Sequence, residues 1–203
     1  MEFRRVLFRS ILRGLRPEHA VATARALYDA GFRVIEVPLN SPEPFASIAA
    51  IRAALPADAV IGAGTVLDGA SVAALVQAGG ELVVMPHADT AVIRAAVAAG
   101  LPCVPGVATP TEAFAALAAG ACALKLFPAE MLSPPVLQAM RAVLPAGTRL
   151  LPVGGITPAS LAPYVKAGAA GFGLGSALFT PALTVDEVRA RALAFRAAWA
   201  AMP

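Results

Sequence analysis

The stretch Ala118-Ala-Gly-Ala-Cys-Ala-Leu-Lys-Leu-Phe-Pro128 shows how this chain alternates between two kinds of secondary structure. An alanine-rich helical pattern ends at a glycine, a short apolar run follows, and a proline stops that run. Glycine just past a helix supplies a left-handed cap, and the apolar run is typical of a buried strand. The same helix-ending glycine recurs at Gly31, Gly79, Gly100 and Gly168. We therefore expect one strand–helix unit to repeat along the chain.

Eight such units can be assigned. The expected strands are residues 6–13, 33–37, 60–64, 82–85, 102–104, 122–126, 149–153 and 171–174. The expected helices are residues 17–30, 43–55, 70–78, 89–99, 111–119, 135–143, 158–167 and 185–200. Strict alternation favours a parallel sheet, and eight units predict an α/β chain folded as a single (β/α)8 TIM barrel over residues 11–203. An open doubly wound sheet is the alternative, although no Gly-x-Gly-x-x-Gly follows the first strand.

The first ten residues, Met1 to Ser10, differ from the rest of the chain. They contain three of its fourteen arginines and no alanine. They also lack the long apolar region and the small-residue cleavage site of a secretory signal. We expect residues 1–10 to be a foreign or mis-assembled leader joined to a truncated first strand. By strand alternation Arg9 would share the face of Arg13 and lie deeper in the barrel.

The composition limits the possible partners. With 203 residues, 58% of them hydrophobic and 14% charged, the chain can bury one sizeable core. The net charge of +3 is spread over scattered basic residues, so no nucleic-acid partner is expected. Glycine, proline or charge interrupts the apolar runs, which argues against a membrane span. Cys103 and Cys122 fall in expected buried strands, so we predict reduced structural thiols and a cytoplasmic location.

Lys125 stands in the middle of the expected sixth strand and is one of two lysines in the chain. A lysine in a strand that is apolar on both faces is costly unless its ammonium is paired or its pKa falls. Alternation places Ala121 and Ala123 on its side of the strand, which leaves room for a ligand. The alternative is a lysine that extends into solvent at the strand end.

Several other polar residues stand at expected strand ends. They are Arg13, Glu36, Thr65 and the pair Pro86 and His87. The carboxyl ends of the strands and the loops after them form the active site of a TIM barrel. Each residue alone could be an ordinary rim or core residue. Their coincidence at one rim predicts a site there.

Lys125 and Glu36 are the expected catalytic pair. At its reference pKa of about 10.4, a lysine amine is neutral at pH 7 in only about one molecule in 10³ to 10⁴, and burial raises that fraction. A neutral amine attacks a ketone to form a Schiff base, whose iminium stabilises a neighbouring carbanion. Glu36 would then act as general acid and base. A structural ion pair between the two side chains is the alternative and is compatible with the catalytic role.

Two glycine-rich segments, Pro152-Val-Gly-Gly-Ile156 and Gly173-Leu-Gly-Ser176, follow the seventh and eighth expected strands. Loops at these two positions, with bare backbone N–H groups, commonly bind phosphate in this architecture. Tight turns alone are the alternative. The expected phosphate donors are Gly154, Gly155, Gly175 and Ser176.

These two segments form a larger pattern with Ile11-Leu-Arg-Gly14, Glu36-Val-Pro-Leu-Asn-Ser-Pro42, Gly62-Ala-Gly-Thr-Val-Leu67 and Leu124-Lys-Leu-Phe-Pro128. From Ile11 to about Ala200, the chain resembles the class I 2-keto-3-deoxy-6-phosphogluconate (KDPG) and galactonate aldolases. The resemblance implies Lys125 as Schiff-base former, Glu36 as acid/base, and a homotrimer without metal or cofactor. It also implies reversible cleavage of a phosphorylated keto-deoxy sugar acid to pyruvate and D-glyceraldehyde 3-phosphate. The expected substrate-binding residues are Arg13, Thr65 near the carboxylate, Pro86, Phe127, Val153 and the four phosphate donors.

Within this family, three positions are similar to the galactonate branch. The gluconate branch usually has Glu-Val-Thr-Leu-Arg-Thr where this chain has Glu36-Val-Pro-Leu-Asn-Ser41, and its arginine binds the pyruvyl carboxylate. Asn40 replaces that arginine here, and Arg13 matches the substitute carboxylate binder of the galactonate branch. Val153 replaces a threonine at a position associated with stereochemistry at C4. The resemblance thus implies 2-dehydro-3-deoxy-6-phospho-D-galactonate as the substrate, in galactonate catabolism.

Three other readings remain open. The substrate could be the gluconate epimer or 4-hydroxy-2-oxoglutarate. A metal-dependent pyruvate aldolase is disfavoured because His19 and His87 are the two histidines and no carboxylates cluster around them. The third reading is a sugar-phosphate-binding barrel without catalysis. His87 also departs from the family pattern, and it would contact either substrate or water.

Overall fold

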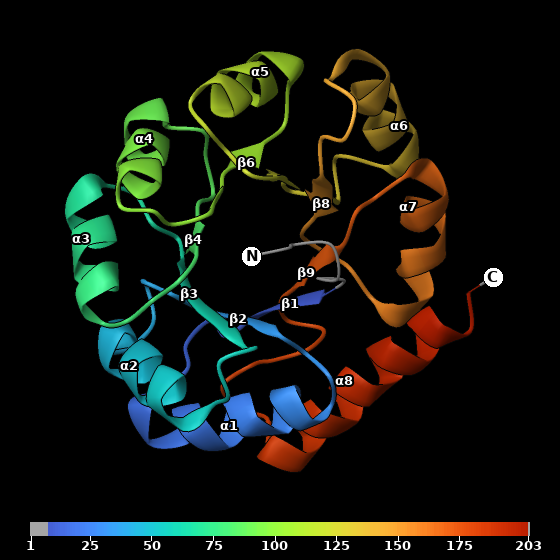
Figure 1. Ribbon diagram of the computed structural model, residues 1–203. Coiled ribbons are helices and arrows are strands. Elements are labelled where there is room, and N and C mark those ends of the chain that lie inside the picture. Colours follow the sequence, from blue (N-terminus) through green and yellow to red (C-terminus); the bar gives the residue numbers. More distant parts are fainter. Residues whose placement is uncertain (1–7, 203) are drawn as a thin grey trace.

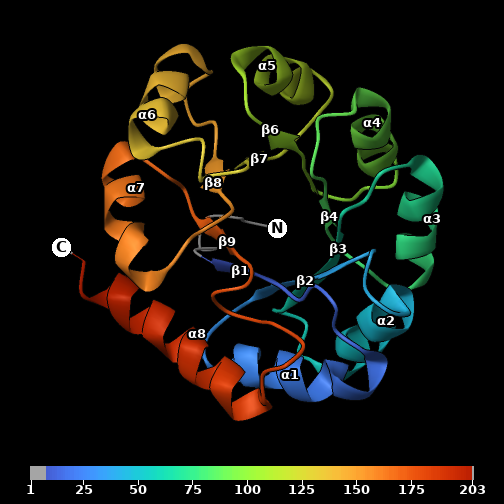
Figure 2. The same ribbon diagram turned by 180° about the vertical axis from the view of Figure 1, so that it is seen from behind.

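The computed structural model describes residues 8–202, in which nine short strands alternate with eight α-helices. The strands lie around a common centre and the helices lie outside them (Figure 1; Figure 2). The strands are β1 (Phe8–Ile11), β2 (Val34–Pro38), β3 (Val60–Gly64), β4 (Val83–Val84), β5 (Cys103–Val104), β6 (Gly106–Val107), β7 (Leu124–Leu126), β8 (Leu150–Pro152) and β9 (Phe172–Leu174). Every strand pairing among them is parallel.

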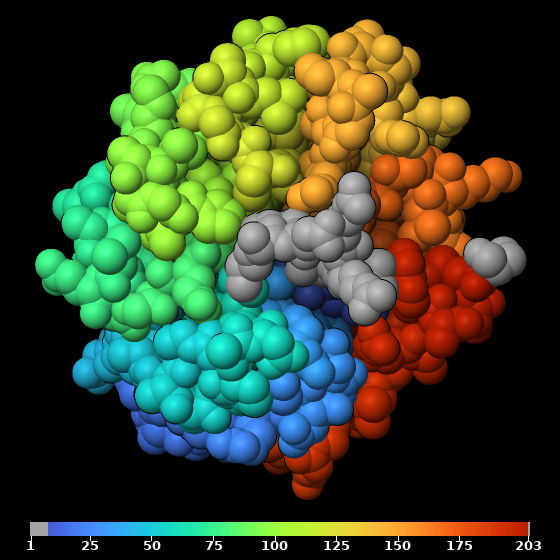
Figure 3. All heavy atoms as spheres, viewed as in Figure 1, coloured from blue at the N-terminus to red at the C-terminus, as the bar shows by residue number. Residues whose placement is uncertain are grey.

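The helices form the outer layer. They are α1 (Pro17–Asp29), α2 (Pro44–Ala54), α3 (Gly69–Gln77), α4 (Thr90–Ala98), α5 (Pro110–Ala118), α6 (Pro134–Val143), α7 (Leu161–Ala167) and α8 (Val185–Ala200). Most neighbouring helices contact one another, and α8 returns beside α1 (Figure 1). The two ends of the colour scale, blue and red, therefore adjoin on the surface (Figure 3). Across residues 8–202, no helix has both the length and the apolar character needed to cross a membrane.

The expectation of a single closed (β/α)8 barrel is wrong. The strands form a six-stranded sheet in the order β5-β4-β3-β2-β1-β9 and a separate three-stranded sheet in the order β6-β7-β8. Pro105 separates β5 from β6, and because proline has no N–H it cannot donate to the ladder there. At the other seam, an isolated parallel bridge joins Val153, the residue after β8, to Gly173 in the middle of β9.

Local signals account for the helix boundaries. Asp68 and Asp89 accept hydrogen bonds from backbone N–H groups at the starts of α3 and α4. Reciprocal capping boxes of threonine and glutamate begin α5 and α8. The prediction that five glycines end helices is supported, because all of them have the positive φ of a left-handed cap. They are Gly31, Gly79, Gly100, Gly120 and Gly168.

Strand alternation separates two apolar layers. Side chains that face the helices, such as Ile35 and Ile61, belong to a large core between the strands and the helices. A smaller cluster on the inner faces contains Val34 and Ala123. Two residues farther along those same strand faces, the apolar side chains give way to Glu36 and Lys125. The inner apolar layer therefore forms the floor beneath these two charged residues.

The predicted leader is only partly described by the structure, because its first seven residues lie outside residues 8–202. Phe8, Arg9 and Ser10 belong to β1, which pairs with β2 on one side and β9 on the other. Phe8 stacks on Phe32 with ring centroids 5.5 Å apart and contacts Trp199 edge-on at 5.9 Å. These three residues are thus integrated into the fold, and the foreign origin of the leader stays a prediction.

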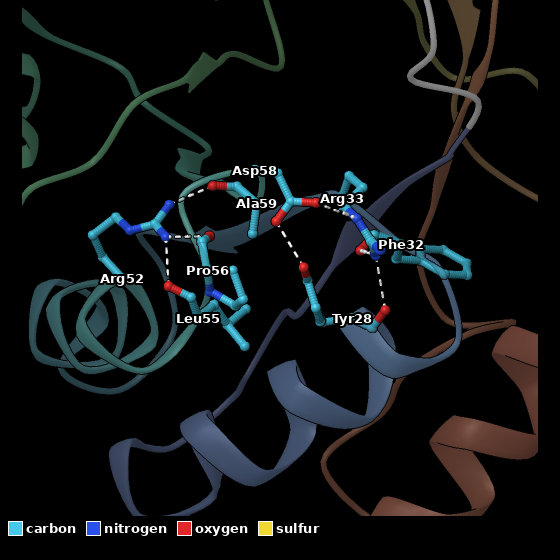
Figure 4. Close-up of polar contacts among 8 residues, drawn as sticks. All are labelled: Tyr28, Phe32, Arg33, Arg52, Leu55, Pro56, Asp58 and Ala59. Atoms are coloured by element: carbon cyan, nitrogen blue, oxygen red, sulfur yellow. Dashed lines mark hydrogen bonds and ion pairs between the residues drawn. The ribbon is translucent and has the colours of Figure 1, made fainter.

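Arg52 binds several backbone carbonyl groups where α2 leads into β3 (Figure 4). Its guanidinium donates to the carbonyl oxygens of Leu55 at 2.8 Å, of Pro56 at 2.6 Å, and of Ala59. It also pairs with Glu81 at 2.8 Å. Carbonyl groups at the end of a helix have no partner within the helix, so this side chain satisfies the Leu55 carbonyl at the end of α2. The Pro56 carbonyl also accepts from the Ala59 N–H at 3.0 Å.

A neighbouring contact joins the end of α1 to the same connection (Figure 4). The Tyr28 hydroxyl donates to Asp58 at 2.7 Å, and Arg33 Nε donates to the other Asp58 oxygen at 2.9 Å. Arg33 also lies 4.0 Å from the centroid of the Tyr28 ring. This cluster is exposed, whereas Arg52 is partly buried with 20% of its side chain accessible. We therefore assign Arg52 the larger contribution to stability.

We expect the substitution Arg52→Met to lower the free energy of unfolding by about 2 kcal/mol, the scale of losing hydrogen bonds from a charged group. Urea denaturation monitored by circular dichroism measures the change. Arg25→Met is the matched control, because Arg25 makes one exposed hydrogen bond, to Ala54 at 3.1 Å. Its effect should stay within about 0.5 kcal/mol. Equal effects of the two substitutions would contradict the role given to Arg52.

Candidate active site

A cavity of about 340 Å³ lies at the carboxyl ends of the strands. Eight of the residues predicted for the site line it, and they come from both sheets or the loops after their strands. They are Arg13, Glu36, Thr65, Lys125, Phe127, Val153, Gly154 and Gly175. The structure therefore brings the predicted lysine, carboxylate and glycines to one place.

Lys125 lies in β7 and is 7% exposed. Burial lowers the pKa of its amine from 10.5 to about 8. The negative charge of Glu36 opposes this shift, whereas the positive charges of Arg9 and Arg13 add to it. The amine also lies 4.2 Å from the centroid of the Phe127 ring. At a pKa of about 8, about one molecule in ten carries the neutral amine at pH 7.

Glu36 lies in β2 and is 2% exposed. Its Oε1 is 3.2 Å from Arg9 Nε, which makes an ion pair, and this nitrogen has no hydrogen-bond partner among residues 8–202. Its Oε2 has no hydrogen-bond partner among residues 8–202. The side chain fits because Gly64 in β3 has no Cβ, and a Cβ at that position would collide with the Glu36 carboxylate. The neighbouring strand thus provides space for a buried acid.

Arg13 follows β1, and two neutral groups hold its guanidinium. Nη1 donates to Asn40 Oδ1 at 2.5 Å, and Nη2 donates to Thr65 Oγ1 at 3.4 Å. Thr65 has a φ of +56°, which is a strained backbone conformation for a β-branched residue. Such strain is found at ligand-binding positions that the surrounding fold holds in place. The arrangement leaves a cation and a hydroxyl at one side of the cavity.

The glycine-rich turn after β8 has the backbone expected of a close approach to a ligand. Gly154 and Gly155 have φ values of +110° and +60°, where side chains other than glycine are strained. A Cβ on Gly154 would collide with the carboxylate of Glu130, and one on Gly155 would lie 3.0 Å from Glu130 Cγ. The loop after β7 therefore packs against this turn.

Three predicted residues do not line the cavity: Pro86, Gly155 and Ser176. His87, too, is exposed and outside the lining. Ile11 and Pro38 do line it and were not predicted. A signal for them exists in the sequence, since Pro38 lies two positions after Glu36 on the same face of β2, and Ile11 ends β1 two positions before Arg13. Both were missed because only polar residues were sought there.

A second cavity, of about 590 Å³, is larger than the first. It lies between the start of α1 and the segment before α8, and its lining includes Arg16 and His19. Arg16 is exposed and pairs with Glu18 at 3.7 Å. Since this cavity contains neither a lysine nor a carboxylate, we assign the active site to the smaller one. Throughout residues 8–202, no three or more histidine, cysteine, aspartate or glutamate side chains are grouped to hold a metal ion.

Comparison with known proteins agrees with this geometry. The family model described as KDPG and KHG aldolase matches residues 4–191. The chain belongs to the KDPG and KHG aldolase family. The match spans most of the described chain and includes the strands that carry Lys125 and Glu36.

Individual members of the family are similar over nearly the whole length. The probable 2-dehydro-3-deoxy-6-phosphogalactonate aldolase of Rhizobium meliloti (strain 1021) is 49% identical over 193 residues, which covers 95% of this chain and 91% of that one. The 2-dehydro-3-deoxy-6-phosphogalactonate aldolase of Escherichia coli (strain K12) is 47% identical, with 92% and 91% covered. A solved structure described as native KDPGal superposes with a TM-score of 0.95 at 45% identity, covering 97% of this chain and 95% of that one.

We expect the Lys125 amine to titrate with a midpoint near pH 8, because burial disfavours its charged form. Reductive methylation with ¹³C-formaldehyde and NMR titration measures this in the Lys166→Arg variant, in which Lys125 is the remaining lysine. The matched double variant with Lys125→Arg should lose the signal and keep that of the terminal amine. A midpoint above pH 10 would contradict the dominance of burial.

Proposed function

We propose that this protein is a class I aldolase that reversibly cleaves 2-dehydro-3-deoxy-6-phospho-D-galactonate to pyruvate and D-glyceraldehyde 3-phosphate. The observation that carries the proposal is a buried lysine amine with a pKa lowered to about 8, in one cavity with a buried carboxylate. Family membership and the names of the similar proteins support it. A lysine that only filled space would not require a cavity beside it.

The chemistry begins at the substrate ketone. Neutral Lys125 attacks C2, and Glu36 supplies a proton as the carbinolamine loses water to give the iminium. The Glu36 carboxylate, which has just given up its proton, takes the C4 hydroxyl proton; the C3–C4 bond breaks, and its electron pair moves into the iminium to form an enamine. D-Glyceraldehyde 3-phosphate leaves, Glu36 gives the proton to C3, and water hydrolyses the iminium to release pyruvate and restore Lys125. Because the iminium is the electron sink, no metal or cofactor enters these steps.

The two ends of the substrate would occupy different parts of the cavity. Arg13 and Thr65 supply a cation and a hydroxyl for the C1 carboxylate. The backbone N–H groups of Gly154 and Gly175 would face the phosphate, and Gly155 and Ser176, next to them in the chain, extend the cradle beyond the cavity lining. The aromatic ring of Phe127 would cover the Lys125 amine, which lies 4.2 Å from its centroid. We retain Pro86 as a more distant contributor to the site.

Glu130 places a constraint on this phosphate position. Its carboxylate lies against the Gly154–Gly155 turn, as the Cβ collision at Gly154 indicates. A phosphate dianion at the same turn would repel a carboxylate. Because Glu130 is exposed, it can turn toward solvent when a phosphorylated substrate binds.

Two further proposals concern the assembly and the compartment. The family resemblance supports a homotrimer. A cytoplasmic location is supported by the two cysteines, Cys103 and Cys122, which are free. Burial raises the pKa of the Cys103 thiol to about 12, so this thiol stays protonated and unreactive.

Incubation with pyruvate and sodium borohydride tests the Schiff base. We expect a covalent reduced adduct on the peptide that contains Lys125, because the neutral amine attacks the keto group and hydride fixes the iminium. Mass spectrometry of the digested protein locates the adduct. Lys166, which is exposed, is the internal control and should stay unmodified. Adduct formation in the variant Lys125→Arg, or an unmodified Lys125 in the native chain, would sink the proposal.

Comparison of the two C4 epimers tests the substrate. We expect a higher kcat/KM for the galactonate epimer than for the gluconate epimer, measured as pyruvate release coupled to lactate dehydrogenase. Val153→Thr should shift the ratio toward the gluconate epimer by about fivefold, because one added hydrogen bond of about 1 kcal/mol acts on that epimer. Val76→Thr on the exposed face of α3 is the control and should leave the ratio unchanged. A native preference for the gluconate epimer would contradict the assignment.

A further inference from the structure

Arg13 differs from the other site cation, Arg9, in the kind of partner that it has. Arg9 lies beside the carboxylate of Glu36, whereas within residues 8–202 Arg13 takes part in no ion pair. Both side-chain partners of Arg13 are neutral: the amide oxygen of Asn40 and the hydroxyl of Thr65. The guanidinium is thus held in place while its full positive charge remains available to an anion.

The Asn40-Ser41 dipeptide contacts two successive residues of the loop after β1. Asn40 Oδ1 accepts from the Arg13 side chain at 2.5 Å, and Ser41 Oγ accepts from the Gly14 backbone N–H at 2.9 Å. Ser41 is 8% exposed, so the second contact is shielded from water. The loop after β2 therefore fixes both the backbone and the side chain of the loop after β1.

Asn40 itself does not line the cavity, whereas Arg13 and Thr65 do. Arg13 and Asn40 are both exposed, so their hydrogen bond contributes little to the stability of the fold. An arginine side chain loses rotamer freedom when it is fixed, and that loss opposes binding. A partner that fixes it before the ligand arrives removes part of that cost from binding.

We propose that Asn40 is a positioning residue that holds the uncompensated Arg13 guanidinium toward the carboxylate of a 2-keto acid. This inference rests on the proposed function and deepens it, because it identifies what makes the site select keto acids over uncharged ketones. The inference requires that the residue at position 40 be a neutral hydrogen-bond partner of Arg13. An aspartate at the same position would hold Arg13 equally well but would cancel its charge and repel the substrate carboxylate.

Steady-state kinetics of the retro-aldol reaction tests the inference. We expect Asn40→Ala to raise KM about tenfold, the equivalent of about 1.4 kcal/mol, and to change kcat less than threefold. The thermal midpoint should stay unchanged, since the contact is exposed. In an Arg13→Ala background, Asn40→Ala should have no further effect on KM, because Asn40 acts through Arg13. Ser41→Ala is a comparison variant with a broader effect, since it loosens the backbone.

Asn40→Asp provides a second readout. Cancelling the Arg13 charge removes one of the influences that lower the pKa of Lys125, so that pKa rises. The acidic limb of the kcat/KM profile should therefore move to higher pH, and KM should exceed that of Asn40→Ala. An unchanged KM in Asn40→Ala, an equal KM effect in the Arg13→Ala background, or an unmoved pH profile in Asn40→Asp would each overturn the inference. If the native chain formed no borohydride adduct with pyruvate, the proposed function itself would fail instead.

Discussion

The site depends on the removal of one amine from water. Lys125 is held on the inner face of β7 above the apolar cluster that contains Val34 and Ala123, and burial is the largest influence on its pKa. The negative charge of Glu36 opposes the shift. The pKa of the amine is therefore about 8, and most of the lysine stays protonated at pH 7. This balance suits an amine that has to be neutral when it attacks and charged once it is an iminium. The small side chain of Ala123 leaves space beside Lys125, and the missing Cβ at Gly64 leaves space for the Glu36 carboxylate.

Arg9 introduces a competing interaction in the same interior. It is 3% exposed, and all three of its guanidinium nitrogens lack hydrogen-bond partners among residues 8–202. An ion pair removed from water repays its desolvation only when its remaining polar atoms are satisfied. The contact between Arg9 and Glu36 Oε1, at 3.2 Å, therefore lowers the stability of the fold. The other carboxylate oxygen, Oε2, has no partner within the described part of the chain and is available for proton transfer. A small or apolar residue at position 9 would return both carboxylate oxygens to the cavity.

The sequence was a good guide to which residues meet and a poorer guide to how the strands close. Lys125, Glu36, Arg13 and Thr65 could be found because strand ends in a parallel α/β chain lie at one edge, whatever the exact pairing. Whether the strands close into one barrel is harder to predict. Apolar runs in the sequence reveal the strands, but they do not show whether hydrogen bonds continue from each strand to the next around the ring. Pro105 is evident in the sequence, but whether it divides the sheet depends on which strands pair with β5 and with β6, and the sequence does not show that pairing. Arg9 was placed on the inner face by alternation, but its contact with Glu36 needs the register of β1 against β2.

The two seams between the sheets give the site its particular construction. Lys125 belongs to the three-stranded sheet, whereas Glu36 and the loops that carry Arg13 and Thr65 belong to the six-stranded sheet. Backbone hydrogen bonds still cross the seam at Pro105, because the Cys122 N–H donates to the Cys103 carbonyl at 3.0 Å and the Lys125 N–H donates to the Pro105 carbonyl at 2.9 Å. A keto acid bonded to Lys125 and held by Arg13 would connect the two sheets directly. Binding to the native state alone raises its stability with the logarithm of the ligand concentration over Kd, so the keto acid would add a second connection between the two sheets.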